Sequence, residues 1–385
     1  MEHLINKRVK DIQISGIRKF SNLVANYKDA ISLTIGQPDF PTPEHIKEAG
    51  KVAIAANKTT YTLNAGLLEL RQAAANFLRT KYKLAYRPED EIIVTNGASE
   101  AIDITLRTIL EDGAEVILPG PVYPGYEPII KMCGAVPVYV DTTGNGFKLS
   151  ADLLRDKITE HTRAVILPYP SNPTGCVMTE NDLGGIADLL QDKEIFVISD
   201  EIYSELIYNG THVSIASIPP MREKTIVING LSKSHSMTGW RIGFTFAPVY
   251  LTQHMLKVHQ YNSTCASTIS QHAAIEALTA GIDDAEMMKQ EYKARRDFVY
   301  DRLLALGFDV EKPDGAFYIF PSIKQFHMKS FEFAAKLLEE QRVAVVPGDA
   351  FSQLGEGYIR ISYAYSMDIL EEGMNRIERF VKGRS

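Results

Sequence analysis

Short apolar runs alternate with helical patterns through the middle of the chain. The runs lie at residues 92–95, 116–118, 136–140, 164–167, 195–198 and 225–228. Between them apolar residues recur every three or four positions, as in the segment after Asn96 that carries Ile102, Leu106 and Ile109. Strands without polar alternation, separated by helices, are typical of a mostly parallel sheet covered by helices on both faces. The pattern predicts an α/β fold.

The pattern changes beyond Gly281. A long charged helix is expected at 285–306, followed by strands at 316–320, 343–346 and 358–362, a helix at 331–341 and a final helix. This mixture predicts a smaller α+β domain. We expect a large domain at 46–282 and a small domain at 283–385, with 1–45 packed on the small domain.

Composition and net charge exclude several classes of protein. The chain has 385 residues, 45% of them hydrophobic and 23% charged, which is ordinary for a globular protein. Its net charge of −7 and the lack of a basic run predict no nucleic-acid partner and no membrane partner. The first residues lack the apolar core of a secretion signal, and three scattered cysteines favour a reducing compartment, so we expect a cytoplasmic protein. The nine histidines show no paired metal-ligand spacing, so no metal is expected.

Polar residues that follow the predicted strands are candidates for chemistry, because ligands bind at the carboxyl ends of parallel strands. Gly97, Ala98 and Ser99 begin a helix after the first strand and suit a phosphate, although Ser99 as an ordinary helix cap is an alternative. Asp200 ends another strand, where a carboxylate is costly without a positive partner. The alternative is that Asp200 caps the next helix.

Three further residues lie in loops after strands. Lys233 follows the strand at 225–228 in a loop of small residues, where desolvation would make its amine a nucleophile. Arg241 lies eight residues further on and could hold a phosphate with its planar fork. Asn172 lies between two prolines in a rigid loop. The alternative for Lys233 and Arg241 is a surface loop with two solvated charges, and the alternative for Asn172 is a plain turn.

The segment Gly230–Gly243 resembles the pyridoxal-phosphate lysine motif of the class I/II aminotransferases, in the aspartate aminotransferase superfamily. The segments Asn172–Gly175, Asp200–Tyr203 and Ser32–Phe40 and the residue Arg360 occur in the order of that family. The resemblance covers nearly the whole chain and implies the pyridoxal-phosphate-dependent transferase fold, type I, with pyridoxal 5'-phosphate as cofactor. It also implies ping-pong transfer of an amino group from an amino acid to a 2-oxo acid.

In this family, Lys233 would bind the cofactor covalently and then carry the proton. Asp200 would pair with the pyridine nitrogen and keep it protonated. Asn172 and Tyr203 would bind the phenolic oxygen, and Tyr123 would stack on the ring, unless it is simply a core tyrosine.

The resemblance also implies how the phosphate is held. Its contacts would come from Ala98, Ser99, Ser232 and Arg241. Many members have serine in place of Gly230, which leaves the contact from Ser232 open. Tyr61 matches a tyrosine that reaches the phosphate of the neighbouring subunit, so the resemblance implies a homodimer with shared active sites.

Arg360 matches the family arginine that binds the substrate α-carboxylate, together with Asn172 and the backbone of Gly36. A solvent-facing arginine on a half-buried strand is the alternative. The N-terminal segment would cover the substrate, with Ile14, Ile17 or Arg18 near its distal end.

The chain is most similar to the bacterial aminotransferase A type, which implies N-acetyl-LL-2,6-diaminopimelate and 2-oxoglutarate as substrates in lysine biosynthesis. Ser99 stands where an aspartate-specific subgroup has a lysine, which argues against plain aspartate. An aspartate, aromatic or broad-specificity aminotransferase and a C–S β-lyase on the same fold are alternatives. A ligand-sensing domain without enzyme activity is a more remote one.

Overall fold

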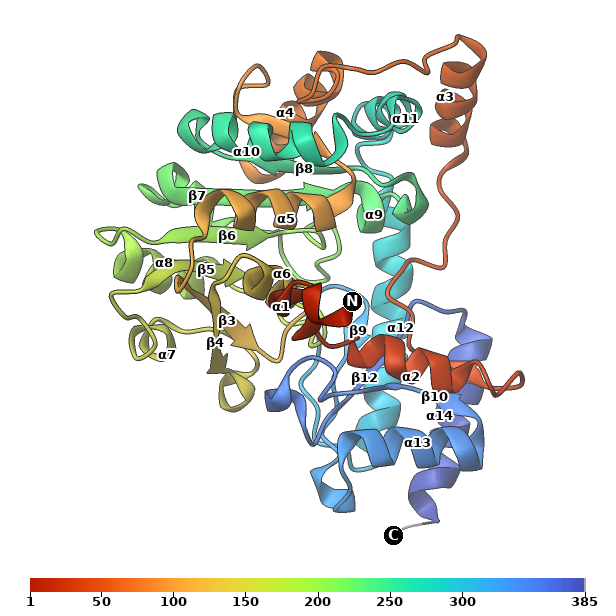
Figure 1. Cartoon of the computed structure of the whole chain (residues 1–385). Helices are drawn as coiled ribbons and strands as arrows, with labels where there is room; N and C mark the ends of the chain where they lie inside the picture. The colour runs from red at the N-terminus through yellow and green to blue at the C-terminus, as the bar shows by residue number, and fades with distance from the viewer. Residues whose placement is uncertain (384–385) are drawn as a thin grey trace.

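A computed structural model describes residues 1–383 (Figure 1), so the last two residues of the predicted small domain lie outside the described part. Its main sheet has seven strands in the order β2-β8-β7-β6-β5-β3-β4. The strands are β2 (Ile92–Thr95), β3 (Glu115–Gly120), β4 (Val136–Asp141), β5 (Thr162–Leu167), β6 (Phe196–Asp200), β7 (Thr225–Gly230) and β8 (Gly243–Phe246). β8 runs antiparallel to both of its neighbours, and the other adjacent pairs are parallel. The predicted α/β fold with a mostly parallel sheet is confirmed.

Helices cover both faces of this sheet (Figure 1). Successive side chains of a strand point to opposite faces, and β2 illustrates the consequence. Ile93 packs with α5 (Gly97–Ile109), α6 (Tyr126–Met132) and α10 (Val249–Ser263). Ile92 and Val94 point to the other face of the sheet. There they pack against α3 (Glu44–Ala55), α4 (Leu68–Tyr82) and α11 (Thr268–Leu278). The rest of that face is covered by α7 (Ala151–Arg155) and α8 (Glu180–Leu190).

The C-terminal part forms a second region, joined to the first by the long helix α12 (Ala285–Ala305) (Figure 1). Its three-stranded antiparallel sheet contains β11 (Val346–Pro347), β12 (Ile359–Ser362) and β9 (Tyr318–Ile319), and α13 (Ser330–Gln341) and α14 (Met367–Lys382) pack against the same buried cluster.

The N-terminal segment also contributes to this second region. Here α1 (Lys7–Lys10) is followed by α2 (Gly16–Val24), whose Phe20 is buried in the same cluster as residues of α13 and α14. β1 (Ile31–Ser32) pairs in parallel with β10 (Val343–Ala344). The bounds of the two predicted domains stay a prediction.

Several local expectations were wrong. The strand expected at 316–320 is reduced to β9, because Ala316 has a left-handed backbone with φ of 56°. The strand expected at 343–346 is divided between β10 and β11, which pair with different strands. The predicted loop around Lys233 contains a one-turn helix, α9 (Leu231–Ser234), and β8 was not predicted.

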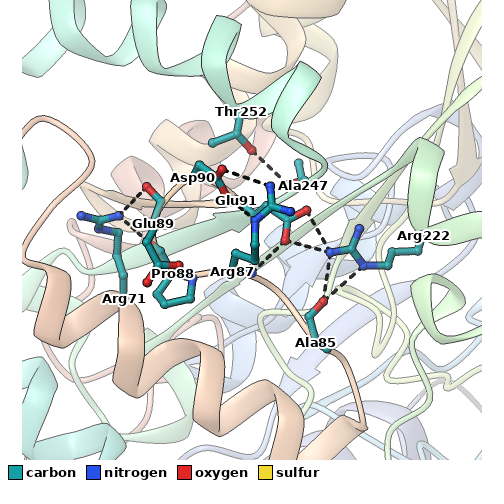
Figure 2. A network of polar contacts seen from close by, with 10 residues as sticks. All are labelled: Arg71, Ala85, Arg87, Pro88, Glu89, Asp90, Glu91, Arg222, Ala247 and Thr252. Carbon is teal, nitrogen blue, oxygen red and sulfur yellow. Dashed lines mark hydrogen bonds and ion pairs between the residues drawn. The ribbon is translucent and has the colours of Figure 1, made fainter.

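A network of polar contacts holds the segment that precedes β2, at the amino end of this strand (Figure 2). Arg71 of α4 donates to the carbonyls of Pro88 and Glu89, and Arg222 pairs with Glu91 at 2.9 Å. The carbonyl of Glu91 in turn accepts the N–H of Ala247, which follows β8. Neither a helix that could cross a membrane nor a group of three or more side chains suited to a metal ion occurs among residues 1–383.

Candidate active site

One cavity collects almost all of the predicted site residues. The segments that follow β2, β5, β6 and β7 at their carboxyl ends meet the strand β12 there. The cavity has a volume of about 280 Å³. Its lining includes Gly36, Ala98, Ser99, Tyr123, Asn172, Asp200, Tyr203, Ser232, Lys233, Arg241 and Arg360. Of the residues predicted to contact the cofactor or the substrate carboxylate, Tyr61 alone does not line this cavity.

Lys233 projects from the short helix α9 into the cavity. Its Nζ donates a hydrogen bond to the carbonyl of Gly36 and lies 5.9 Å from the ring centre of Tyr203. Burial, together with the positive charges of Arg360 and Arg241, lowers the pKa of Lys233 to about 8, although Asp200 opposes the shift. The amine is therefore available as a nucleophile near neutral pH.

Asp200 is the last residue of β6 and is 6% exposed. Its Oδ2 accepts a hydrogen bond of 2.6 Å from the hydroxyl of Tyr126, and its Oδ1 accepts a longer one of 3.3 Å from the N–H of Ile202. Burial raises the pKa of Asp200 to about 6, which the bond from Tyr126 counteracts. No helix directly follows β6 within the described chain, so the alternative of a helix cap is wrong.

The start of α5 lies against Arg241. The guanidinium of Arg241 donates to the carbonyl of Asn96 at 3.2 Å and to that of Thr238 at 3.1 Å. A Cβ on Gly97, which has φ of 75°, would lie 2.2 Å from Nη2 of Arg241, so only glycine permits this approach. The first N–H groups of a helix lack intrahelical partners, and here they lie beside a fixed cation. Asn96 rather than Ser99 is the N-cap residue, so the cap alternative for Ser99 is wrong.

Close packing explains why residue 230 is glycine rather than the serine that many members of the family have. A Cβ on Gly230 would lie 2.9 Å from the carbonyl oxygen of Ile242 and 3.1 Å from Cδ1 of Ile202. β7 and β8 are paired closely at this point, so a serine would require the backbone to shift. Ser232 is buried and lines the cavity two residues later.

Arg360 of β12 is only 2% exposed, so the alternative of a solvent-facing arginine is wrong. Its Nη1 donates to Oδ1 of Asn172 at 2.8 Å, and its Nη2 donates to the carbonyl of Thr34 at 2.6 Å. The Cζ atom lies 4.3 Å from the ring centre of Tyr318. Within residues 1–383 no carboxylate pairs with Arg360, and its buried Nε has no hydrogen-bond partner. A buried cation without a counter-ion is costly, which makes this position a receptor for an anion.

The N-terminal residues separate into two groups. Ile17 lines the cavity, while Ile14 is 63% exposed and neither it nor Arg18 lines the cavity. Tyr61 is 83% exposed on a loop whose carbonyl at Thr60 accepts a hydrogen bond of 2.6 Å from Thr268.

Among the polar residues that line the cavity, three had no role assigned from the sequence: Thr34, Tyr126 and Tyr318. Thr34 acts through its backbone carbonyl, which no side-chain pattern reveals. The hydroxyl of Tyr318 lies 2.8 Å from that of Tyr203, and burial raises the pKa of Tyr203, so both phenols stay protonated. Tyr126 stands in the same short segment as Tyr123, and that proximity was an available signal.

Comparison with known proteins agrees with this geometry. The family model for aminotransferase class I and II matches residues 28–377. A probable N-acetyl-LL-diaminopimelate aminotransferase of Bacillus subtilis (strain 168) is 62% identical, over 99% of this chain and 96% of that protein. An aspartate aminotransferase of Pyrococcus abyssi is 44% identical over 98% of each chain. The crystal structure of Pyrococcus protein-A1 superposes with a TM-score of 0.96 at 45% identity and 98% coverage of both chains.

The fold and the cavity, with its half-buried lysine and its buried carboxylate and arginine, define a transferase of type I architecture. The chain belongs to the aminotransferase class I and II family, and it is an aminotransferase. The resemblance carried by the lysine motif is confirmed.

Proposed function

We propose that this aminotransferase uses pyridoxal 5'-phosphate, bound covalently by Lys233, and that its amino donor is N-acetyl-LL-2,6-diaminopimelate with 2-oxoglutarate as acceptor. The observation that carries the cofactor proposal is the convergence of a lysine with a lowered pKa and a buried carboxylate in one cavity.

The residues fit this cofactor at three places. A phosphate suits the start of α5 at Ala98 and Ser99 beside Arg241, with the hydroxyl of Ser232 within the same cavity. A protonated pyridine nitrogen suits Asp200, because a cationic partner favours the charged form of a buried carboxylate. The exposed face of Tyr123 suits stacking on the ring.

Other residues of the cavity would bind the substrate and move its proton. Arg360, oriented by Asn172 and the carbonyl of Thr34, binds the α-carboxylate of an amino acid through its remaining N–H donors. Once the substrate's amino group has replaced its own on the cofactor, Lys233 would take the proton from the substrate α-carbon onto Nζ and deliver it to the cofactor carbon that had carried the lysine, as its lowered pKa permits. When bound, pyridoxal phosphate supplies the electron-withdrawing ring that accepts the charge left on that carbon. Tyr203, whose hydroxyl lies 2.8 Å from that of Tyr318, would donate a hydrogen bond to the phenolic oxygen of the cofactor.

The substrate proposal rests on two supports. The Bacillus relative at 62% identity carries the name of this activity. In addition, the cationic residues that line the described cavity are Lys233, Arg241 and Arg360, and each already has a proposed task. A short second carboxylate such as that of aspartate would find no further cation there. A longer substrate would extend past Ile17 towards the mouth of the cavity.

A homodimer in the cytoplasm completes the proposal. Tyr61 is largely exposed although its loop is held by hydrogen bonds from α11, as suits a side chain that enters a neighbouring subunit. Enzymes of this family typically act as dimers on amino acids and 2-oxo acids.

A spectrum with single donors tests the function. The purified protein with pyridoxal phosphate should show visible absorption, which N-acetyl-LL-2,6-diaminopimelate should abolish at a lower concentration than aspartate or phenylalanine. Addition of 2-oxoglutarate should restore the absorption, and initial rates at varied donor and acceptor should give parallel double-reciprocal lines. A colourless protein would refute the cofactor assignment, and a preference for aspartate would refute the substrate.

Aspartate or aromatic transamination is the second candidate, because the relative from Pyrococcus abyssi is an aspartate aminotransferase. A C–S β-lyase would instead release pyruvate and ammonia from cystathionine, which the same preparation can be tested for.

A further inference from the structure

Tyr126 contacts two residues of the candidate active site, Asp200 and Tyr123. It is the first residue of α6 and is 2% exposed. Its hydroxyl contacts Asp200 and its ring contacts Tyr123, so one side chain supports the groups proposed to face the edge and the plane of the cofactor ring.

The contact with Asp200 is the stronger of the two hydrogen bonds that this carboxylate accepts. The Tyr126 hydroxyl lies 2.6 Å from Oδ2, whereas the N–H of Ile202 lies 3.3 Å from Oδ1. Bonds from a neutral donor to a charged acceptor are short and strong, and they favour the ionised form. Each carboxylate oxygen can accept two hydrogen bonds and here accepts one, so Asp200 keeps capacity to accept a proton-bearing nitrogen as well.

Burial works in the opposite direction. It raises the pKa of Asp200 to about 6, and the hydrogen bond from Tyr126 is the largest effect that lowers it. Loss of the hydroxyl would therefore leave a larger fraction of Asp200 neutral near pH 7 and held only by the longer bond from Ile202.

The contact with Tyr123 is one of packing. The two rings meet edge to face, with centres 5.5 Å apart and an interplanar angle of 87°. The ring of Tyr123 also lies over Gly125, where a Cβ would be 2.3 Å from its Cε1 atom. Tyr123 is thus held between Gly125 and the ring of Tyr126.

We propose that Tyr126 is a positioning residue, whose hydroxyl keeps Asp200 charged and oriented while its ring holds Tyr123 in place. The inference rests on the proposed function, because it requires a cofactor ring between Asp200 and Tyr123.

Two variants separate the contributions. Tyr126→Phe removes the hydroxyl and keeps the ring, while Tyr126→Leu removes both contacts. Tyr86→Phe is the matched control, because Tyr86 is 6% exposed, lies outside the cavity and has a hydroxyl without a hydrogen-bond partner among the described residues.

We expect Tyr126→Phe to weaken pyridoxal phosphate binding at least about tenfold, the effect of one hydrogen bond to a charged group. The midpoint of the pH titration of the visible absorption should shift, and kcat should fall with little change in KM, because Arg360 still binds the carboxylate. Tyr126→Leu should lose more, and Tyr86→Phe should match the wild type in all three measurements.

Equal behaviour of Tyr126→Phe and Tyr86→Phe would overturn the inference. A fall in thermal stability without a change in affinity or titration midpoint would also overturn it, because that result describes a structural tyrosine. If the wild type itself binds no pyridoxal phosphate, the proposed function fails instead, so the two failures are distinguishable.

Discussion

Replacement of Arg360 by lysine tests the carboxylate site most directly. The substitution keeps the positive charge and removes the planar fork. In the structure, Nη1 donates to Asn172 at 2.8 Å and Nη2 to the carbonyl of Thr34 at 2.6 Å, while the buried Nε has no partner. A guanidinium has five N–H donors, so three remain for a ligand.

The expected magnitude follows from this count of donors. A lysine has three N–H donors on one atom and cannot serve Asn172, Thr34 and both oxygens of a carboxylate together. The loss of one charge-assisted hydrogen bond costs about 1.5–3 kcal/mol. We therefore expect kcat/KM to fall about 10- to 150-fold. Both substrates should be affected, because the amino donor and the 2-oxo acid each present a carboxylate at this position.

The assay is steady-state transamination with each substrate varied in turn, together with thermal unfolding. Arg295→Lys is the matched control, because Arg295 is 6% exposed and donates to both oxygens of Asp39, at 2.9 and 2.8 Å, outside the cavity. That control should lower Tm and leave kcat/KM unchanged. The reasoning is refuted if Arg360→Lys stays within about twofold of the wild type, or if both variants lose activity equally.

The remaining predictions concern the cofactor end and the pH response. Gly97→Ala should weaken pyridoxal phosphate binding about tenfold or more, because the new Cβ would lie 2.2 Å from Nη2 of Arg241. Gly113→Ala, with φ of 82° and nothing within 4 Å, should change stability alone, as fluorescence titration and Tm would show. Burial and two nearby guanidinium groups lower the pKa of Lys233 to about 8, so the rate of covalent cofactor capture by the apoprotein should rise with pH and level off above that value. A rate independent of pH in stopped-flow absorbance would contradict this. Burial alone would raise the pKa of Glu100, but hydrogen bonds from a buried histidine, a backbone amide and a serine lower it to about 2. Because this is below the unfolded value of 4.5, the stabilisation is present above that pH and is lost as pH falls towards 2. Glu100→Gln should thus cost on the order of 2 kcal/mol in urea unfolding near neutral pH and little in strong acid.

The main sheet and most of the site could be predicted from local patterns. Every parallel strand of the large sheet coincides with an apolar run. In β3, β5, β6 and β7 the reason is burial on both faces, which leaves no room for polar alternation. Lys233, Asp200 and Asn172 were found because each lies at the carboxyl end of such a strand or in the segment after it, and the carboxyl ends of parallel strands share one edge. Strand β8 was missed because it is only four residues long and begins at Gly243, the last residue of the lysine motif.

The sequence by itself determined the fold class, the family and most of the polar residues that line the cavity, because these depend on periodicity and on short motifs. Only the tertiary structure decided that Arg360 is buried without a counter-ion and that the carbonyl of Thr34 orients it. It also decided that Tyr126 bonds to Asp200 and that Gly97 admits Arg241 beside the start of a helix. These contacts join residues up to 326 positions apart, and they involve backbone carbonyls and close approaches that carry no side-chain pattern. Hydrogen-bond partners and burial are properties of the folded neighbourhood, and for that reason they could not be predicted from the order of residues alone.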